Sequence, residues 1–265
     1  MGSVLSGMER PVEHADALRT TVPNSARMYD YYLGGKDNYA ADRALAERVL
    51  ARAPVVADLV RANRAFLRTT ARDLAARTGI RQFLDLGCGL PARDGSVGDV
   101  VRRVDPRCRI AYADIDPMVV SHARALVAVD PGTAAAEADA RDPRAVLAHP
   151  ELARLLDPAA PMAVFLMNVL HFLRDDENPG GVVAGLLAAL PPGSRVVYTH
   201  AESTPELDAV SLLYTEADLP LTPRPFADIE AFAGRLGVPS GRAVRLRHSS
   251  GAELPIVACV AGKAG

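Results

Sequence analysis

The segment Gln82-Phe-Leu-Asp-Leu-Gly-Cys-Gly89 limits the possible folds of this chain more than any other stretch. Its apolar run indicates a buried strand, and two glycines spaced one apart end that strand. Glycine lacks a Cβ atom, so the backbone can turn sharply there and approach a ligand closely. A helix is expected to begin near Ser96. The glycines therefore lie at the carboxyl end of a strand, where open α/β sheets bind ligands.

Strand and helix patterns alternate after Arg81, which predicts an α/β fold of the Rossmann type, with a mostly parallel sheet and right-handed crossovers. Seven strands are expected near 82–86, 109–113, 133–138, 162–168, 194–200, 242–247 and 255–261. Helices are expected near 96–104, 117–128, 143–156, 180–190, 205–217 and 226–236. The last two strands predict a hairpin with one strand antiparallel to the rest.

The N-terminal part has a different organisation. Residues 1–22 show no periodicity and predict a mobile tail, and residues 23–78 predict a helical cap in front of a domain over 79–265. Helices are expected from Ala41 to about Ala51 and again after Pro54 to about Arg77. A core-facing stripe recurs at near-helical spacing in the second helix: Leu59, Val60, Asn63, Phe66, Leu67 and Leu74.

Composition excludes several classes of protein. No apolar run approaches the ~20 residues of a membrane span, and residues 1–10 do not resemble a signal peptide. The net charge of −2 gives no general attraction to nucleic acid or acidic lipid. Cys88, Cys108 and Cys259 lack metal-site spacing and predict reduced thiols. We therefore expect a cytoplasmic protein with no metal, membrane or nucleic-acid partner.

Asp85, two residues before the first glycine, indicates the charge of the ligand. A dinucleotide site normally has an aliphatic side chain there, because a carboxylate repels the anionic pyrophosphate. A ligand with a cationic centre is attracted instead. S-adenosylmethionine fits this requirement, since its sulfonium and its α-amino group are both positive. Gly87, Cys88, Gly89 and Leu90 are expected to form the loop around it.

Two further acids follow later strands. Asp114 lies 25 residues after Gly89 and is expected to accept both hydroxyls of a ribose. Asp139, after a third strand, is expected to accept the adenine amino group. Their neighbours Ile115 and Ala140 complete the predicted cofactor site, whereas Asp116, before Pro117, is expected to cap a helix. Each acid taken singly fits a helix cap equally well, but three acids ending successive strands favour a ligand site.

A dinucleotide alternative exists, because Gly87-Cys-Gly-Leu-Pro-Ala92 fits the pattern G-x-G-x-x-A. Pro91 within this pattern, Asp85 before it and Asp139 after it argue against NAD.

The core resembles the class I S-adenosylmethionine-dependent methyltransferases, whose cofactor site is this glycine loop with acids after the second and third strands. More narrowly, the chain resembles an actinobacterial S-adenosyl methyltransferase family formerly catalogued as a domain of unknown function. The matching segments span residues 23–200: Ser25–Tyr39, Asn63-Arg64, Phe83–Pro91, Asp114–Pro117 and Val169–Phe172. Cys88 replaces an expected threonine, and Ala92–Val97 replaces a more amide-rich loop. The resemblance implies S-adenosylmethionine as the methyl donor.

His171 is the candidate catalytic base. Its segment Val169-Leu-His-Phe172 is similar to the Val-Leu-His-Asp-Trp type of small-molecule O-methyltransferases, although Phe172 replaces the acid. A histidine that only packs beneath the cofactor fits the sequence equally well. His200, at the end of the fifth strand, is a second candidate for which a structural role is favoured. Asn168 is expected to reach the methionine part of the cofactor.

The segment around Gly34-Gly35 contains four of the seven tyrosines. Tyr29, Tyr32, Lys36 and Asn38 are interpreted as a lid hinged at the two glycines. Packing of the tyrosines against the sheet domain is the alternative. Asn63 and Arg64 on the next helix are expected to pair with the cofactor carboxylate.

These features predict a methyltransferase that acts on a small-molecule acceptor at oxygen or nitrogen, in specialised metabolism. A protein that senses S-adenosylmethionine without transferring its methyl group is the main alternative, ahead of an NAD-dependent oxidoreductase. No basic stripe with interleaved aromatic residues supports a nucleic-acid acceptor. A homodimer is left open.

Overall fold

The structure is a computed structural model that describes residues 19–92, 94–234 and 242–263. Seven strands in these ranges form one sheet in the order β3-β2-β1-β4-β5-β7-β6. They are β1 (Gln82–Leu86), β2 (Arg109–Asp114), β3 (Thr133–Glu137), β4 (Met162–Leu166), β5 (Arg195–Ala201), β6 (Val244–Arg247) and β7 (Glu253–Gly262). The first five strands are parallel, β7 is antiparallel to β5, and β6 is antiparallel to β7. The predicted seven-stranded sheet and its C-terminal hairpin are confirmed.

The helices follow the predicted alternation. They are α2 (Ser25–Tyr32), α3 (Ala40–Arg52), α4 (Val55–Arg77), α5 (Val97–Val104), α6 (Pro117–Leu126), α7 (Pro143–Ala148), α8 (Pro150–Leu155), α9 (Pro179–Ala189), α10 (Pro205–Glu216) and α11 (Phe226–Gly234). Two 3₁₀ segments, η1 (Leu170–Phe172) and η2 (Asp175–Glu177), follow β4.

Two helix boundaries differ from the sequence-based expectation. The single helix predicted over 143–156 is wrong: His149 is extended and Pro150 begins α8, because proline fits the first turn of a helix but not its interior. The segment around Ser25–Tyr32 was not predicted as a helix, yet Asn24 caps it by accepting the backbone N–H groups of Ala26 and Arg27. The end of the helix predicted over 226–236 lies outside the described residues, as do residues 1–18 of the predicted tail.

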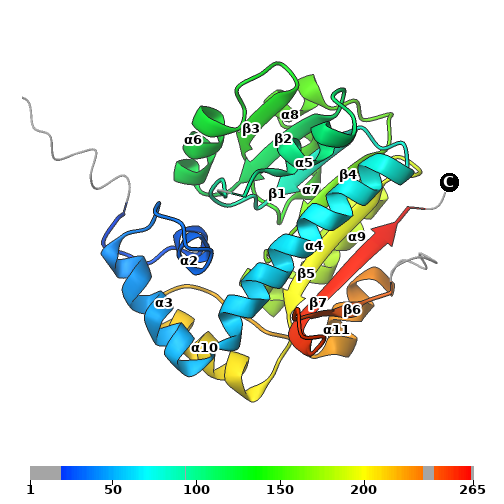
Figure 1. The fold of residues 1–265 in the computed structure, drawn as a ribbon. Coiled ribbons are helices and arrows are strands. Elements are labelled where there is room, and N and C mark those ends of the chain that lie inside the picture. Colours follow the sequence, from blue (N-terminus) through cyan, green and yellow to red (C-terminus); the bar gives the residue numbers. More distant parts are fainter. Residues whose placement is uncertain (1–18, 93, 235–241, 264–265) are drawn as a thin grey trace, which may run out of the picture.

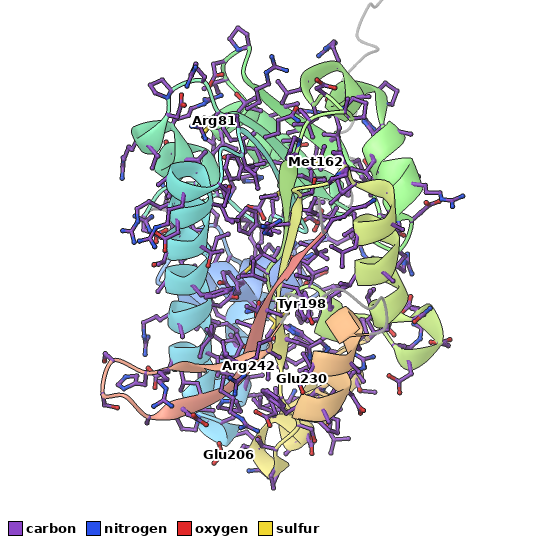
Figure 2. All side chains as sticks on the ribbon, turned by 90° about the vertical axis from the view of Figure 1, so that its right-hand side faces the viewer. Arg81, Met162, Tyr198, Glu206, Glu230 and Arg242 are labelled. Carbon is purple, nitrogen blue, oxygen red and sulfur yellow. The ribbon has the colours of Figure 1, made fainter. Side chains whose placement is uncertain are left out.

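The sheet is buried on both faces because its strands alternate apolar side chains between two cores. Leu84 and Leu86 of β1 join the core beneath α9 and α11, whereas Phe83 joins the core beneath α4 and α5. Figure 2 shows this layering, with α4 on one side of the strands and α9 on the other. Asp85 alternates with Leu84 and Leu86, so its side chain faces the layer that contains α4.

A third core joins the N-terminal helices to α10. It contains Met28 of α2, Leu45 and Val49 of α3, and Leu207 and Val210 of α10, all of them buried. Figure 1 shows α2 and α3 beside α10, with α4 running from this group across the sheet. Helices far apart in sequence therefore close one side of the sheet's carboxyl edge.

Strand order fixes where a ligand can enter. The chain places β2 and β3 on one side of β1 but β4 and β5 on the other side. Open α/β sheets form a crevice at such a switch point, at the carboxyl ends of the strands. In the described part of the chain, no helix combines the length and the apolar character needed to cross a membrane.

Candidate active site

A cavity of about 460 Å³ opens between the carboxyl edge of the sheet and the helices α2, α3, α4 and α10. Residues at the carboxyl ends of β1 and β2, and in the segments after β1, β2, β3 and β4, line one side: Asp85, Gly87, Cys88, Gly89, Asp114, Ile115, Asp139, Ala140 and Asn168. Apolar side chains line the other side, toward β5 and β7: Val49, Val56, Leu59, Phe172, Leu207, Val210, Leu221 and Ile256. The sequence-predicted acids thus meet in one cavity.

The glycine loop is held against β2. The backbone N–H groups of Gly87 and Cys88 both donate to the carbonyl of Ala113, at 2.7 and 3.1 Å. Gly87 has a φ of +74°, and a Cβ atom there would lie 2.3 Å from a methyl carbon of Val169. Gly89 also has positive φ, but no atom lies within 4 Å of its Cβ position. The loop therefore needs glycine for its conformation, and at Gly89 it leaves open space beside the cavity.

Asp85 is a buried carboxylate that forms no hydrogen bond to any described residue, although it lines the cavity. Burial raises its pKa to about 7; the charge of Arg64 opposes this effect, and that of Asp114 adds to it. A buried carboxylate without a hydrogen-bond partner is costly. A cationic ligand in the cavity would supply the missing partner.

Asp114 connects the end of β2 to the glycine loop. Its Oδ2 atom accepts the backbone N–H of Gly89 at 3.0 Å, and its Oδ1 atom accepts that of Asp116, also at 3.0 Å. Burial raises the pKa of Asp114, while these N–H groups lower it. Each oxygen keeps a second lone pair for a ligand hydroxyl. Asp116 caps α6 through the N–H of Met118, which confirms its predicted structural role.

Asp139 also lines the cavity, but unlike Asp85 and Asp114 its carboxylate is paired with an arginine. Its carboxylate lies 2.6 Å from the guanidinium of Arg141, which also pairs with Glu177 at 2.6 Å. Arg141 holds the pKa of Asp139 below its usual value. A ligand amino group therefore has to share this carboxylate with an arginine, which the strand pattern did not indicate.

Asn63 is engaged at both ends of its amide. Its Nδ2 donates to the Tyr29 hydroxyl at 2.8 Å, and its Oδ1 accepts the Thr199 hydroxyl at 2.7 Å. The Thr199 oxygen also accepts the backbone N–H of Asn168 at 2.9 Å. Asn168 has left-handed backbone geometry, with a φ of 56°. This chain of hydrogen bonds joins α2, α4, β5 and the end of β4, so Asn63 positions the cavity wall.

Arg64 lines the cavity next to Asn63, with most of its side chain covered. Its Nε donates to Asp94 at 3.0 Å, and it also donates to the carbonyl of Gly95. Arg64 therefore fixes the loop after the glycines. Its guanidinium also lines the cavity, where the sequence predicts that it pairs with the carboxylate of the cofactor.

His171 lies in η1 and is buried against the cavity. Its Nδ1 accepts the backbone N–H of Ala201 at 3.3 Å, so the neutral ring carries its proton on Nε2. Burial, and next the nearby His200 and Arg224, hold the pKa of His171 well below its usual value. The ring is therefore neutral at physiological pH.

His200 and Leu90 do not line the cavity, so the cavity gives no support to their assignment to the substrate and cofactor sites. His200 is fully buried on β5; its Nε2 lies 2.9 Å from Nη1 of Arg224, and its Nδ1 lies 2.8 Å from the carbonyl of Ala201. Because arginine only donates, Nε2 accepts and Nδ1 carries the proton. Burial lowers its pKa to about 3. The strand alternation turns its side chain to the face opposite Thr199.

The four residues interpreted as a lid separate into two groups. Tyr29 and Tyr32 of α2 line the cavity, but Lys36 is exposed and Asn38 is buried away from it. Asn38 Nδ2 donates to Asp30 at 2.8 Å, and a Cβ atom on Gly35 would lie 1.8 Å from the same carboxylate. The Gly-Gly-Lys-Asp-Asn segment therefore forms a structural turn after α2.

The sequence interpretation missed the wall that α10 contributes. Leu207, Val210 and Tyr214 recur at helical spacing, which indicates one buried face. That pattern does not reveal what the face contacts. The structure brings Tyr214 to the cavity, opposite the N-terminal helices.

Comparison with known proteins agrees with this geometry. The profile of the S-adenosyl methyltransferase family matches residues 11–240. A search of curated proteins finds no match to the chain.

Solved structures include two similar proteins. The first, described as a methyltransferase of Thermobifida fusca, has 34% sequence identity and a TM-score of 0.86, and the match covers 96% of this chain and all of that one. The second, a DUF574 family protein of Streptomyces avermitilis, has 31% identity and a TM-score of 0.82, and the match covers 92% of this chain and 98% of that one. Human N-acetylserotonin methyltransferase in complex with S-adenosylmethionine shares the fold, at 20% identity and a TM-score of 0.51 over 95% of this chain and 65% of that one.

Proposed function

The chain belongs to the S-adenosyl methyltransferase family, and from that premise we propose that it methylates a small-molecule acceptor at oxygen or nitrogen. It is an S-adenosylmethionine-dependent methyltransferase with the seven-stranded fold of that enzyme class. Its family was formerly known as a domain of unknown function. The observation that carries the proposal is the single cavity that joins the unpartnered Asp85 carboxylate to an apolar chamber.

The residues on the polar side of the cavity fit the cofactor. Asp85 offers a buried negative charge to the ammonium or sulfonium, and the open space at Gly89 admits a close approach to the backbone. Asp114 is proposed to accept the ribose hydroxyls, and Asp139 to accept the adenine amino group beside Arg141. Arg64 and Asn168 are proposed to bind the methionine part. When bound, S-adenosylmethionine supplies a methyl group already activated by its sulfonium.

The apolar side of the cavity supports an enzyme over a sensor. The cavity continues past His171 to Tyr32 and α10, so it holds space beyond the cluster of acids. The protein's part in transfer is to align the acceptor and exclude water, and apolar walls serve both purposes.

His171 is proposed as the base that activates a hydroxyl acceptor. Its depressed pKa keeps the ring neutral, which is the form able to take a proton, and at the same time makes it a weaker base than a free imidazole. Acceptance through Nε2 requires the other tautomer, which loses the hydrogen bond from the Ala201 N–H. That tautomer turns the Nδ1–H toward the Ala201 N–H and leaves this N–H without an acceptor, at a cost of about 1–3 kcal/mol, which is less than the roughly 3–5 kcal/mol represented by the ~10²–10⁴-fold gain from a positioned base.

Calorimetric titration with S-adenosylmethionine, S-adenosylhomocysteine and NAD tests the cofactor assignment. We expect S-adenosylmethionine and S-adenosylhomocysteine to bind with micromolar affinity and NAD not to bind. Folded protein that binds neither would contradict the site. An acceptor screen with donor labelled at the methyl group then tests transfer: label in a small organic product supports the proposal, and label only in nucleic acid or protein overturns it.

Other expectations stay predictions. They are the division into a cap over 23–78 and a catalytic domain over 79–265, the cytoplasmic location, the place in specialised metabolism and the homodimer.

A further inference from the structure

Charge is distributed unevenly around the cavity. The charged side chains among its described lining residues all come from α4, from the ends of β1–β3 or from the segment after η1: Arg64, Asp85, Asp114, Asp116, Asp139, Arg141, Arg174 and Glu177. Arg141 pairs with Glu177, which places that segment beside the end of β3. The chamber toward β5, β7 and α10 therefore has no charged residue in its described wall.

Besides His171, two tyrosines bring polar groups to this apolar chamber. The Tyr32 hydroxyl is buried and makes no hydrogen bond of regular geometry to the described residues; its polar neighbour is the hydroxyl of Tyr214. Tyr214 of α10 lines the same chamber and is buried. Burial, and next the neighbouring Tyr214, raise the pKa of Tyr32 above its usual value, and burial raises that of Tyr214 to about 12. Both phenols are therefore uncharged at physiological pH.

Tyr29 shows the contrast within α2. Its hydroxyl accepts from Asn63 at 2.8 Å and lies 3.4 Å from the carbonyl of Val60. Tyr31 turns outward, where its hydroxyl donates to Glu47 at 3.2 Å, and it does not line the cavity. An unpaired buried hydroxyl is uncommon in a native protein, and a ligand that pairs with it removes the desolvation cost. Tyr32 and Tyr214 are therefore placed to recognise something that enters the chamber.

We propose that the acceptor is an uncharged, predominantly apolar molecule whose hydroxyl or carbonyl oxygen is recognised by the Tyr32–Tyr214 pair. This inference rests on the proposed function, because it assigns the acceptor class of the same cavity. The apolar wall favours an aromatic or alicyclic body, since burial of apolar surface drives its binding. A carboxylate, phosphate or ammonium on that body would lose its hydration without gaining a counter-ion. The hydroxyl pair adds orientation, because a phenol both donates and accepts hydrogen bonds.

Binding of naphthyl probes to the protein saturated with S-adenosylhomocysteine tests the proposal. The chain contains no tryptophan, so the fluorescence of a naphthyl group can be followed without indole emission. The probes are 2-naphthol, its hydroxyl-free parent naphthalene and the anion 2-naphthoate. We expect 2-naphthol to bind at least about 10-fold more tightly than 2-naphthoate.

The tyrosine variants test the recognition of oxygen. Tyr32→Phe and Tyr214→Phe remove one hydroxyl each and should weaken 2-naphthol by about 3–10-fold, the effect of one lost hydrogen bond. Naphthalene should bind these variants as well as it binds the wild type. Tyr31→Phe is the matched control and should change neither affinity.

Three results would overturn the inference: 2-naphthoate binding as tightly as 2-naphthol, no binding of 2-naphthol, or unchanged 2-naphthol affinity in both cavity variants. S-adenosylhomocysteine binding is measured separately for every variant. If that binding is intact while probe selectivity is absent, the acceptor class is wrong and the proposed methyl transfer stands. If S-adenosylhomocysteine does not bind the folded wild type, the proposed function itself fails.

Discussion

The carboxylate of Asp114 accepts the backbone N–H of Gly89 at 3.0 Å, so the acid that ends β2 also holds the loop that follows β1. Two strands thereby share one binding surface. A change at Asp114 should therefore loosen the glycine loop and remove the proposed contact with the ribose.

Asp114→Asn should weaken S-adenosylmethionine and S-adenosylhomocysteine by at least about 10-fold. The variant keeps the size of the side chain but loses one acceptor oxygen, which serves Gly89 or a ribose hydroxyl. Calorimetric titration measures the effect. Asp130→Asn, which changes an acid paired with Arg102 away from the cavity, is the control and should bind normally. Unchanged affinity in folded Asp114→Asn would remove this residue from the cofactor site.

Asp85→Asn should stabilise the ligand-free protein while weakening cofactor binding. The folded-state pKa of Asp85 is raised from 3.8 to about 7, so the folded state binds more protons and loses stability as pH rises through that window. The variant lacks this destabilisation. At pH 8 its Tm should therefore rise, by about 2–4 °C for each 1 kcal/mol gained in the free energy of unfolding. Thermal melts at pH 5 and pH 8 measure the difference, which should shrink at pH 5. An equal Tm gain at both pH values would show that Asp85 is not the titrating group.

The pH dependence of cofactor affinity follows from the same carboxylate. A cation binds the ionised form of Asp85, so wild-type affinity for S-adenosylmethionine should fall as pH drops below about 7. Titrations from pH 5.5 to pH 8.5 measure this slope. Asp85→Asn should bind more weakly and lack the slope, and a wild-type affinity independent of pH would contradict the prediction.

His171→Ala should slow turnover by about 10²-fold or more while cofactor affinity changes little, because a base acts on the acceptor. The low pKa of His171 also implies that kcat of the wild type has no acidic limb near pH 6.5. Steady-state kinetics and S-adenosylhomocysteine titration separate the two effects. Equal losses in turnover and cofactor affinity would indicate a structural histidine.

Lys36→Ala should leave cofactor affinity and turnover unchanged, because its side chain is exposed and outside the cavity wall. Asp30→Ala should instead destabilise the protein by about 1–3 kcal/mol, since its carboxylate accepts the Asp37 N–H at 2.9 Å and Asn38 Nδ2 at 2.8 Å. Denaturant unfolding and kinetics measure both variants. A loss of turnover in Lys36→Ala without loss of stability would restore its predicted lid role.

The sequence by itself determined the sheet and the polar side of the cavity. Strands with apolar residues throughout predict a sheet buried on both faces, and the carboxyl ends of parallel strands meet at one edge. Asp85, Asp114 and Asp139 could therefore be placed together from local pattern alone. Gly87 and Gly89 both have positive φ, and this requirement for glycine arises from the local backbone conformation of the loop.

Only the tertiary structure decided how side chains at that edge are used. The Thr199 hydroxyl donates a hydrogen bond to the side chain of Asn63, which lies 136 residues away in the sequence. Arg141 forms ion pairs with both Asp139 and Glu177. The Ala201 N–H sets the tautomer of His171, and α10 brings Tyr214 to Tyr32 across most of the chain. A hydrogen bond depends on distance and angle between groups that the chain brings together only by folding. Periodicity along the sequence specifies which face of an element is buried, and packing alone specifies the partner that buries it.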